Sequence, residues 1–363
     1  MGRIFFGQRS YDFAQVKKSM EEKIDPTFSS ALQFCHQWLN GQSSFQLFTS
    51  GSTGEPKPIE LTRAQMETSA QSTCTALQLG QGNTALVCLN TSYIAGIMML
   101  VRGMVADMDL WLTAPVSSPL QEIDPSVPID FAAFVPLQLQ TMLQENDPDV
   151  IRRLQNMKAI IVGGAPVSIE LAEKINSLSS PVYLTYGMTE TVSHIALRRL
   201  NGKEKTEDYH ILPGVSIDVD ERNCLKIRAA VTNNQWIQTN DIVTLTSPSS
   251  FLWLGRADYT INSGGVKIQP EKIEQILSKQ FVTHGISVFF VAGLPHPILG
   301  EALTLFVETE EPIADALVKE MSSVLERFHI PKAVILLRAF PRTATGKIER
   351  SKIKEAYKNY YAS

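Results

Sequence analysis

The sequence is poor in cysteine, in uninterrupted apolar runs and in clustered charge. Its 363 residues include four cysteines, Cys35, Cys74, Cys88 and Cys224, whose spacing matches no metal site. The most apolar windows, 94–112 and 281–299, are broken by charged residues or by histidine, glycine and proline, so neither predicts a membrane span. The net charge is −4, and the lack of a basic block argues against a nucleic-acid surface. We therefore expect a cytoplasmic protein with reduced thiols, without membrane insertion and without nucleic acid.

Short apolar runs alternate with helical periodicity over the first half of the chain. Runs such as 85–89 and 159–162 are typical of buried strands, and 62–79 and 94–105 have helical spacing. This alternation predicts an α/β domain layered on a largely parallel sheet. After residue 186 short, turn-rich strands predict an antiparallel sheet or small barrel. A compact α+β unit follows, so we predict a large domain, 1–257, and a small domain, 258–363.

A glycine-rich loop follows the strand-like run 44–48. It contains three kinds of group that suit a polyphosphate: flexible glycines, hydroxyls and an ammonium group. They come from Thr49, Ser50, Gly51, Ser52, Thr53, Gly54 and Lys57. The spacing is not that of the Walker A motif, which needs a lysine directly after its last glycine. Taken alone, the loop is equally compatible with a solvated linker.

Five more clusters lie downstream, and several of them follow predicted strands, where α/β sheets place their ligands. They are Gly163-Gly164-Ala165-Pro166, Tyr186-Gly187-Met188-Thr189-Glu190-Thr191, Asp241 in its Gln-Thr-Asn-Asp run, Gly255-Arg256-Ala257-Asp258 leading to Gly264-Gly265, and Pro341–Arg350 with Lys347. In this order and spacing, the six clusters resemble the AMP-forming adenylating superfamily, which includes acyl-CoA ligases, peptide-synthetase adenylation domains and luciferases. The resemblance covers the chain from about residue 45 onward.

The resemblance implies an enzyme, an acid–thiol ligase. Such enzymes join AMP from ATP to a carboxylate, release pyrophosphate, and then exchange AMP for the thiol of CoA. ATP, CoA and a small carboxylic acid are the implied partners, with Mg²⁺ as the implied metal. Catalysis of the first step depends mainly on positioning and on neutralising anionic oxygens.

The resemblance also assigns the nucleotide site. The loop residues Thr49–Gly54 and Lys57 would hold the β- and γ-phosphates. Thr189 would contact the α-phosphate, and Glu190 would hold Mg²⁺, a hard cation suited to carboxylate oxygen. Gly164, Ala165 and Tyr186 would line the adenine slot. Asp241 would bind both ribose hydroxyls with help from Arg256.

The second domain would carry the moving parts of the same enzyme. Lys347 would bridge the α-phosphate and the acyl oxygens. Asp258 would be the hinge about which the domain rotates after adenylation, and the rotation would bring Gly264 and Gly265 to line the thiol channel. A two-glycine hairpin suits close approach of a slender pantetheine arm.

Four features depart from the usual family pattern: Pro58, Asn240 in place of a usual glycine, Tyr259 in place of a common acidic residue, and the short segment before the loop. Pro58 stands where members usually have a glycine, so we expect a stiffer exit from the loop. Members also carry a much longer segment ahead of the loop, so we expect most of one N-terminal subdomain to be missing. The same shortening bears on the usual dimer surface, and a homodimer remains one expectation.

The segment after residue 89 suggests which acid is bound. Asn90–Gly96, with Tyr93, matches the family segment that shapes the acyl pocket, and Arg102 follows nine residues later in an apolar helix. A buried arginine there needs an anionic partner; the alternative is an exposed Arg102 or one paired with a nearby aspartate. The sharper hypothesis rests on a resemblance to o-succinylbenzoate–CoA ligases of menaquinone biosynthesis, which carry an arginine at this spacing that binds a substrate carboxylate. His194 is a second pocket candidate, and a structural role for it is equally compatible with the sequence.

Three other readings stay open from the sequence. The enzyme could act on another aryl or fatty acid, or it could load a carrier protein in place of CoA. A catalytically silent nucleotide-binding relic is the third, although the presence of Lys347, Glu190 and Asp241 argues against it.

Overall fold

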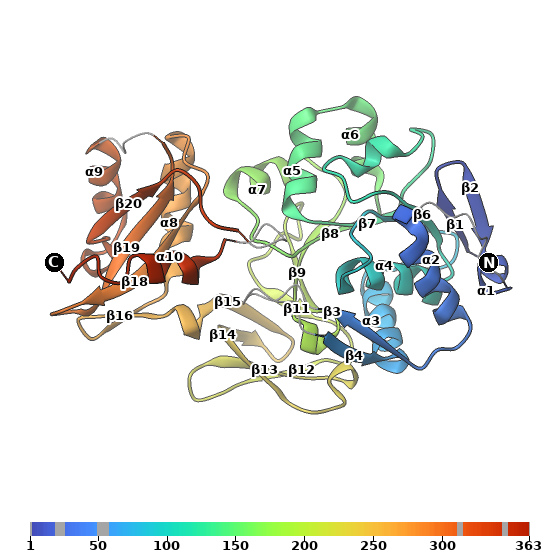
Figure 1. Cartoon of the computed structure of the whole chain (residues 1–363), viewed down its shortest axis with the longest axis horizontal. Coiled ribbons are helices and arrows are strands. Elements are labelled where there is room, and N and C mark those ends of the chain that lie inside the picture. The colour runs from blue at the N-terminus through green and yellow to red at the C-terminus, as the bar shows by residue number, and fades with distance from the viewer. Residues whose placement is uncertain (1, 19–25, 49–57, 311–314, 343–347, 363) are drawn as a thin grey trace.

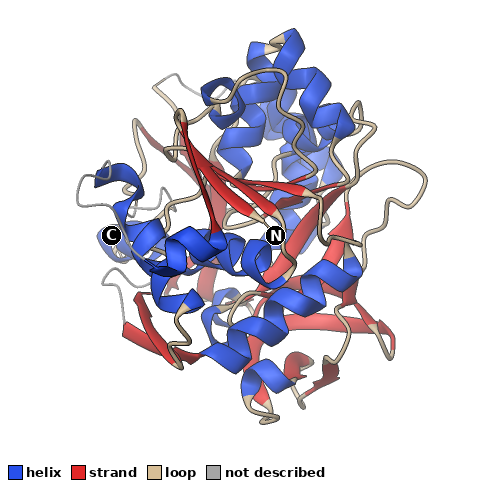
Figure 2. Cartoon of the chain, turned by 90° about the vertical axis from the view of Figure 1, so that its right-hand side faces the viewer, coloured by secondary structure: helices blue, strands red, loops and turns tan. Residues whose placement is uncertain are grey.

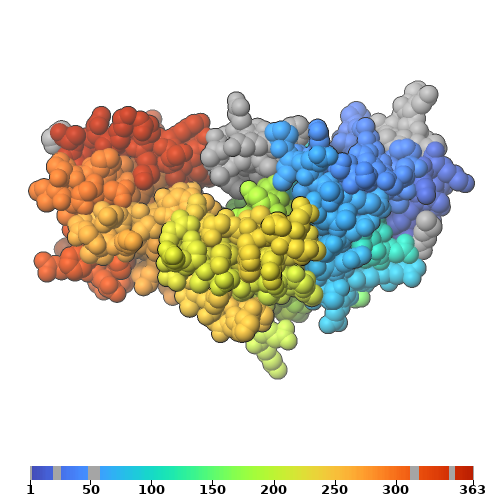
Figure 3. Space-filling view, turned by 90° about the horizontal axis from the view of Figure 1, so that it is seen from below, coloured from blue at the N-terminus to red at the C-terminus, as the bar shows by residue number. Residues whose placement is uncertain are grey.

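The structure is a computed structural model of the whole chain, and it describes residues 2–18, 26–48, 58–310, 315–342 and 348–362. A large sheet-rich part forms one end of the molecule and a smaller part formed by the C-terminal residues lies at the other (Figure 1). The space-filling view shows the same separation, with the orange-to-red C-terminal residues at the end opposite the blue N-terminal ones (Figure 3). The predicted fold class, an α/β protein with a small α+β C-terminal part, is therefore confirmed.

One sheet of thirteen strands runs through the large part, in the order β12-β13-β14-β15-β11-β10-β9-β8-β7-β5-β6-β1-β2. Strands β1, β5, β6, β7, β8 and β9 form its parallel half, whose bounds are Arg3–Phe6, Thr84–Val87, Asp109–Leu112, Phe131–Phe134, Ala159–Val162 and Val182–Gly187. The antiparallel half contains β10 to β15, with bounds His194–Arg199, Tyr209–Ile211, Ser216–Val219, Cys224–Arg228, Ile237–Ser247 and Ser250–Arg256. The turn-rich strands thus continue the same sheet.

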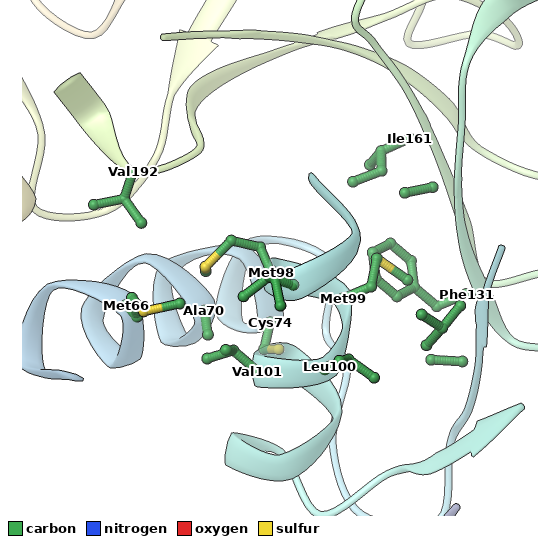
Figure 4. Packing of buried hydrophobic residues seen from close by; sticks show 14 of the residues in the cluster. Met66, Ala70, Cys74, Met98, Met99, Leu100, Val101, Phe131, Ile161 and Val192 are labelled. Carbon is green, nitrogen blue, oxygen red and sulfur yellow. The ribbon is translucent and has the colours of Figure 1, made fainter. Parts of the chain in front are cut away.

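The parallel strands are buried on both faces, which explains their continuous apolar runs. Successive residues alternate between two cores: Phe131 and Ala133 of β7 belong to one, and Ala132 and Phe134 to the other. Helices cover both faces of the strands (Figure 2). Figure 4 shows the first core, where Met66 and Cys74 of α3 pack beside α4, and Met99 of α4 lies toward Phe131 of the sheet.

Two of the covering helices bear directly on the site. Helix α3, Arg63–Ala76, begins with a capping box in which Thr62 accepts the N–H of Gln65 and the side chain of Gln65 reaches back. Helix α4, Ile94–Val105, is buried along residues 96–103, so it lies inside the domain and not on its surface. The other helices of this part are α1, α2, α5, α6 and α7, at Phe13–Lys18, Pro26–Leu39, Pro136–Glu145, Pro148–Asn156 and Ile169–Ile175.

Several N-terminal elements were absent from the sequence interpretation. Strands β1 and β2 (Arg9–Asp12) extend the large sheet beyond β6, and helix α1 directly follows β2. Strand β3 (Ser44–Phe48) pairs antiparallel with β4 (Pro58–Thr62), in a register that sets Phe48 opposite Pro58. Pro58 is therefore the first residue of a strand, a position that tolerates its missing N–H. The two ends of the glycine loop are held side by side as a hairpin.

The small part is built on a five-stranded sheet. Its strands are β16 to β20, at Ile261–Ser263, Val266–Ile268, Phe289–His296, Gly300–Glu308 and Ala333–Leu337. Helices α8 (Pro270–Thr283) and α9 (Asp315–Val324) cover one face, and α10 (Arg350–Ala356) covers the other with its own apolar cluster. Among the described residues, no helix is long and apolar enough to span a membrane.

Candidate active site

A buried carboxylate on β14 occupies the centre of the candidate nucleotide site. Asp241 is only 6% exposed. Its Oδ2 accepts a hydrogen bond from the Tyr186 hydroxyl at 2.8 Å, and its Oδ1 accepts one from the Trp253 indole N–H at 3.1 Å. A carboxylate has about four acceptor positions, so roughly two remain for a ligand. The sequence analysis missed Trp253, because an aromatic residue inside a strand gives no signal of its own.

Arg256 lies opposite Asp241 across the β14–β15 pair. Its Nη1 is 3.8 Å from Oδ1 of Asp241, and its Nη2 donates to Oδ2 of Asp258 at 2.6 Å. The structure thus brings together Tyr186, Asp241 and Arg256, and it places Asp258 on the same guanidinium group. Burial, and then the charge of Asp241, raises the pKa of Tyr186, so its hydroxyl stays a donor at neutral pH.

The second strand-end cluster forms a tight turn. Thr189–Thr191 is a short 3₁₀ helix, η2, in which the Thr191 hydroxyl accepts the N–H of Met188 at 3.0 Å and donates within the turn. Val192 follows with φ +66°, a conformation that is strained for a β-branched residue. The turn leaves Glu190 exposed and Thr189 half-buried. Among the described residues, no group of three or more metal-ligating side chains is assembled.

The remaining predicted adenine contacts lie at the same sheet edge. Gly164 and Ala165 follow β8 directly and are exposed. Strand β8 is the parallel neighbour of β9, which ends at Tyr186 and Gly187. The carboxyl ends of adjacent parallel strands therefore bring the two segments together. Gly164 has φ +84°, which favours glycine at that turn.

Arg102 lies in the last turn of α4 and is only 3% exposed. Its Nη2 donates to the Ser193 hydroxyl at 3.0 Å, and its Nη1 lies 3.7 Å from the sulfur of Met99. Its Nε has no hydrogen-bond partner among the described residues. The alternative of an exposed or aspartate-paired arginine is therefore wrong: the described contacts of this guanidinium are a hydroxyl and a thioether.

A polar network from α3 surrounds this arginine. Ser193 shares a 2.7 Å hydrogen bond with Ser69, and Nε2 of His194 lies 3.1 Å from the Thr73 hydroxyl. Burial, and then the positive charge of Arg102, holds the pKa of His194 well below its usual value, so the imidazole is neutral at physiological pH. A small cavity borders the network, lined among others by Ser69, Ser72, Thr191, His194, Leu212 and Val231.

Tyr93 is placed away from that network. It is the residue that precedes α4 and is half-buried, whereas Arg102 lies in the last turn of the same helix. Nine residues of α-helix separate the two by about 13 Å. The structure therefore puts the two predicted acyl-pocket residues at opposite ends of one helix.

The small part contributes a two-glycine turn. Gly264 and Gly265 join β16 to β17 with φ +59° and +84°, and both are exposed. The N–H of Gly264 donates to the carbonyl of Leu299 at 2.8 Å, which fixes the turn beside the β18–β19 hairpin. The predicted hairpin geometry is present, and its place in a thiol channel stays a prediction.

The remaining predicted phosphate and catalytic residues lie outside the described residues. They are Thr49, Ser50, Gly51, Ser52, Thr53, Gly54, Lys57 and Lys347. The chain on both sides of the Lys347 segment is described: Arg342 pairs with Ile348 in an antiparallel bridge, and the N–H of Glu349 donates to the carbonyl of Pro341 at 2.9 Å.

Comparisons with known proteins show the family of the chain. Residues 10–227 match the model of the AMP-binding enzyme family, and residues 272–347 match the AMP-binding enzyme C-terminal domain. A solved structure from Dyadobacter fermentans, described as an acyl-CoA synthetase (AMP-forming)/AMP-acid ligase II-like protein, is 45% identical, with a TM-score of 0.66. The match covers 95% of this chain and 98% of that one.

More distant relatives carry more specific names. The 2-succinylbenzoate–CoA ligase of Listeria innocua is 25% identical over 93% of this chain and 75% of its own length. The o-succinylbenzoate coenzyme A synthetase of Bacillus subtilis, solved with ATP and magnesium ion, is 21% identical with a TM-score of 0.68, over 85% of this chain and 69% of that one. The second likeness supports the fold alone. From the family model and the Dyadobacter relative, we conclude that the chain belongs to the AMP-binding enzyme family and is an acid–thiol ligase of the AMP-forming acyl-CoA synthetase kind.

Proposed function

We propose that the chain is an ATP-dependent acid–CoA ligase whose acid carries a second carboxylate, with o-succinylbenzoate as the first candidate. The observation that carries this proposal is the guanidinium group of Arg102. It is buried, and its described contacts are one hydroxyl and one sulfur atom. Burial lowers the pKa of Arg102 to about 10, which still leaves it charged at neutral pH.

An uncompensated buried charge destabilises a fold by several kcal/mol. A ligand carboxylate would supply the anion that the buried Arg102 guanidinium lacks among its described contacts. Arginine suits this task because its planar fork can donate two parallel hydrogen bonds to one carboxylate. Neutral His194 adds no competing positive charge, and its hydrogen bond to Thr73 fixes its ring beside the cavity.

The names of relatives support the same substrate class. Curated relatives from Listeria, Staphylococcus and Bacillus at 25% or 26% identity are named 2-succinylbenzoate–CoA ligases. A Bacillus subtilis synthetase of the same fold was solved with the acyl-adenylate OSB-AMP. At this identity the names support the class of reaction more strongly than the particular acid, so the proposal depends on Arg102.

At the nucleotide end, Asp241 would accept hydrogen bonds from the ribose hydroxyls on the oxygen positions that Tyr186 and Trp253 leave free. Thr189 would donate to the α-phosphate. Exposed Glu190 would hold Mg²⁺, which suits one carboxylate together with phosphate oxygens and water and would neutralise developing charge on the phosphates. Gly164 and Ala165 would flank the adenine at the same edge of the sheet.

We assign the moving parts to the small domain and place its boundary between residues 257 and 258. The boundary falls in the short η4 helix, Ala257–Tyr259, that joins β15 of the large sheet to β16 of the small one. Asp258 would be the hinge, Lys347 the catalytic lysine, and Gly264 and Gly265 the lining of the CoA thiol channel.

The test is pyrophosphate release with ATP, Mg²⁺ and CoA over a panel of acids. The panel contains o-succinylbenzoate, benzoate, a medium-chain fatty acid and malonate, and Lys347→Ala sets the background rate. We expect o-succinylbenzoate to give the highest kcat/KM. Arg102→Ala should lower that value by about two to three orders of magnitude, equivalent to roughly 3–4 kcal/mol.

Arg152→Ala is the matched control, because Arg152 is an exposed arginine paired with Asp149 on α6. Its kcat/KM should equal that of the wild type. Turnover of another acid above o-succinylbenzoate would favour the aryl- or fatty-acid alternative. Pyrophosphate release without CoA consumption would favour carrier loading, and no turnover above the Lys347→Ala background would favour the non-catalytic reading.

A further inference from the structure

The connection between the two domains contains a half-buried acid that the proposed chemistry does not use. Glu271 lies in the first turn of α8, and its Oε1 accepts a hydrogen bond from the backbone N–H of Arg256 at 3.3 Å. Its other oxygen, Oε2, is buried without a hydrogen-bond partner among the described residues. Glu271 therefore joins helix α8 of the small domain to the residue whose guanidinium contacts Asp241 and Asp258.

Gln269, two residues earlier, has a similar unsatisfied oxygen. Its Nε2 donates to the Thr260 hydroxyl at 2.8 Å, whereas its Oε1 is buried without a described partner. Both oxygens flank Gly255: a Cβ added there would lie 2.7 Å from Oε2 of Glu271 and 3.1 Å from Oε1 of Gln269. Both oxygens are acceptors without a described donor, and a proton on the carboxyl group of Glu271 would supply one.

We propose that Glu271 is a positioning residue for Arg256 and that it acts as a neutral carboxylic acid, whose Oε2–H donates to the side-chain oxygen of Gln269. One proton then satisfies two buried acceptors, and Oε1 remains free to hold the N–H of Arg256. The role of Arg256 itself rests on the proposed nucleotide site, but the proton on Glu271 can be tested without turnover.

The surroundings favour the neutral acid. Burial raises the pKa of Glu271 to about 7, and the charge of Glu274 on the same helix raises it as well. Arg350 of α10 lowers it, but that guanidinium is already engaged in a bidentate pair with Glu274 at 2.9 and 3.0 Å. Further charged or titratable groups lie on α8 or on the elements that contact it: Lys272 and Lys279 on α8, Arg256 on β15, Glu170, Glu173 and Lys174 on α7, His296 on β18, and Lys319 and Glu320 on α9. Asp258 lies in η4 beside Arg256, and His284 directly follows α8.

A pH dependence of domain attachment follows. The attached arrangement binds a proton that a free glutamate, with its ordinary pKa of 4.5, would release. Its stabilisation is therefore fully present below about pH 4.5 and is lost as the pH rises through about 7. Above that pH, an ionised Glu271 would face the carbonyl oxygen of Gln269, and α8 would hold Arg256 less firmly.

Intramolecular fluorescence transfer in the full chain without substrates measures the attachment. The four native cysteines are buried, so labels can be placed on Lys203→Cys in the large domain and Lys319→Cys in the small one. For the wild type we expect a change in transfer with a midpoint between pH 4.5 and about 7. Glu271→Gln keeps a neutral side chain with an N–H donor, and it should hold the attached value at every pH.

Three further variants complete the design. Glu271→Ala removes both hydrogen bonds, and Gly255→Ala forces a Cβ onto Oε2, so both should give the detached value at every pH. Glu221→Gln, an exposed acid in the β12–β13 turn, should titrate like the wild type. Infrared difference spectra should show a neutral carboxyl carbonyl band in the wild type at pH 6 that Glu271→Gln lacks.

One alternative predicts the opposite outcome. If the Gln269 amide is rotated, its Nε2 donates to an ionised Glu271 and the Thr260 hydroxyl donates to its Oε1. A wild type without the neutral carbonyl band, or a Glu271→Gln variant that keeps the wild-type pH response, would overturn the inference. Neither result would affect the acid panel, so the two proposals can fail separately.

Discussion

Asp241 and Arg102 are both buried charged groups of the large domain, but the protein compensates them very differently. Asp241 accepts hydrogen bonds from a phenol and an indole and lies 3.8 Å from a guanidinium. Arg102 donates to one hydroxyl, and its Nε has no described partner. The contrast teaches that the protein compensates the charge of Asp241 with its own donors, whereas the described contacts of Arg102 include no anion; under the proposed function, the carboxylate of the acid would supply that anion.

This difference matches what each side must recognise under the proposed function. The nucleotide is the same in every turnover, so a pre-assembled set of donors around Asp241 loses little by being rigid. The acid must be distinguished from other acids, and an arginine that is satisfied only by a second carboxylate penalises any acid that lacks one. Substitutions of Asp241 and of Arg102 should therefore change the unfolding free energy in opposite directions.

Removing Asp241, the charge that the protein compensates, should have the largest effect on the unfolding free energy. Asp241→Ala leaves the Tyr186 hydroxyl and the Trp253 indole N–H buried without their acceptor, so we expect the unfolding free energy to fall by about 3 kcal/mol. Urea denaturation measures the change, and Asp218→Ala, at an exposed acid on β12, should stay within about 0.5 kcal/mol of wild type. Equal stabilities for the two variants would show that the Asp241 hydrogen bonds contribute nothing.

Removing the uncompensated charge should change stability in the opposite direction. Arg102→Met keeps a long apolar side chain and removes a buried charge without a described anionic partner. We expect the unfolding free energy to rise by about 1–2 kcal/mol, while kcat/KM for o-succinylbenzoate falls by about two to three orders of magnitude. A destabilised Arg102→Met protein would mean that the fold itself compensates this arginine.

The sequence predicted one half of this contrast better than the other. The apolar pattern around Arg102 placed this residue on a helix, but it left open whether the guanidinium is buried or exposed. The partner Ser193 is 91 residues away, and no local pattern links it to α4. Around Asp241 the family clusters gave Tyr186 and Arg256, but Trp253 carries no motif and is placed only by the pairing of β14 with β15.

The fold was predictable to a similar extent. The buried parallel strands have continuous apolar runs, and these were recognised in the sequence. Strands β1, β2 and β4 are short and partly polar, so they lack that signal. Their structure depends on pairing: β1 pairs with the sequence-distant β6, and β4 pairs with β3 across the glycine loop. The separation of Tyr93 from Arg102 was predictable, because the helix expected at 94–105 is the α4 helix of the structure.

His194 should make a smaller, pH-dependent contribution to the unfolding free energy. Because its pKa in the folded protein is depressed, the unfolded chain binds more protons below about pH 6.5, and stability should fall as the pH drops. His194→Gln should remove up to about 1.4 kcal/mol of this loss per pH unit. Denaturation at pH 5.5 and 7.5 tests it, with exposed His210→Gln as the control. An unchanged slope in His194→Gln would assign the acid sensitivity elsewhere.

The smallest expected effect concerns the hydroxyl that holds the arginine. Ser193→Ala removes the hydrogen bond to Nη2 of Arg102, so the guanidinium should become less ordered. We expect the KM for o-succinylbenzoate to rise about fivefold, equivalent to about 1 kcal/mol, with kcat and the KM for ATP unchanged. A change in kcat alone would point to a role in the chemical step and not in acid binding.

The most direct test of the central claim is a cycle of two enzymes and two acids. Wild type and Arg102→Met are each assayed with o-succinylbenzoate and with an analogue in which one carboxylate, the one that is not adenylated, is replaced by a methyl ketone. We predict that wild type prefers the dicarboxylate by about two to three orders of magnitude in kcat/KM and that Arg102→Met shows no preference. A preference of equal size in both enzymes would contradict the account, because Arg102 would then not bind the second carboxylate.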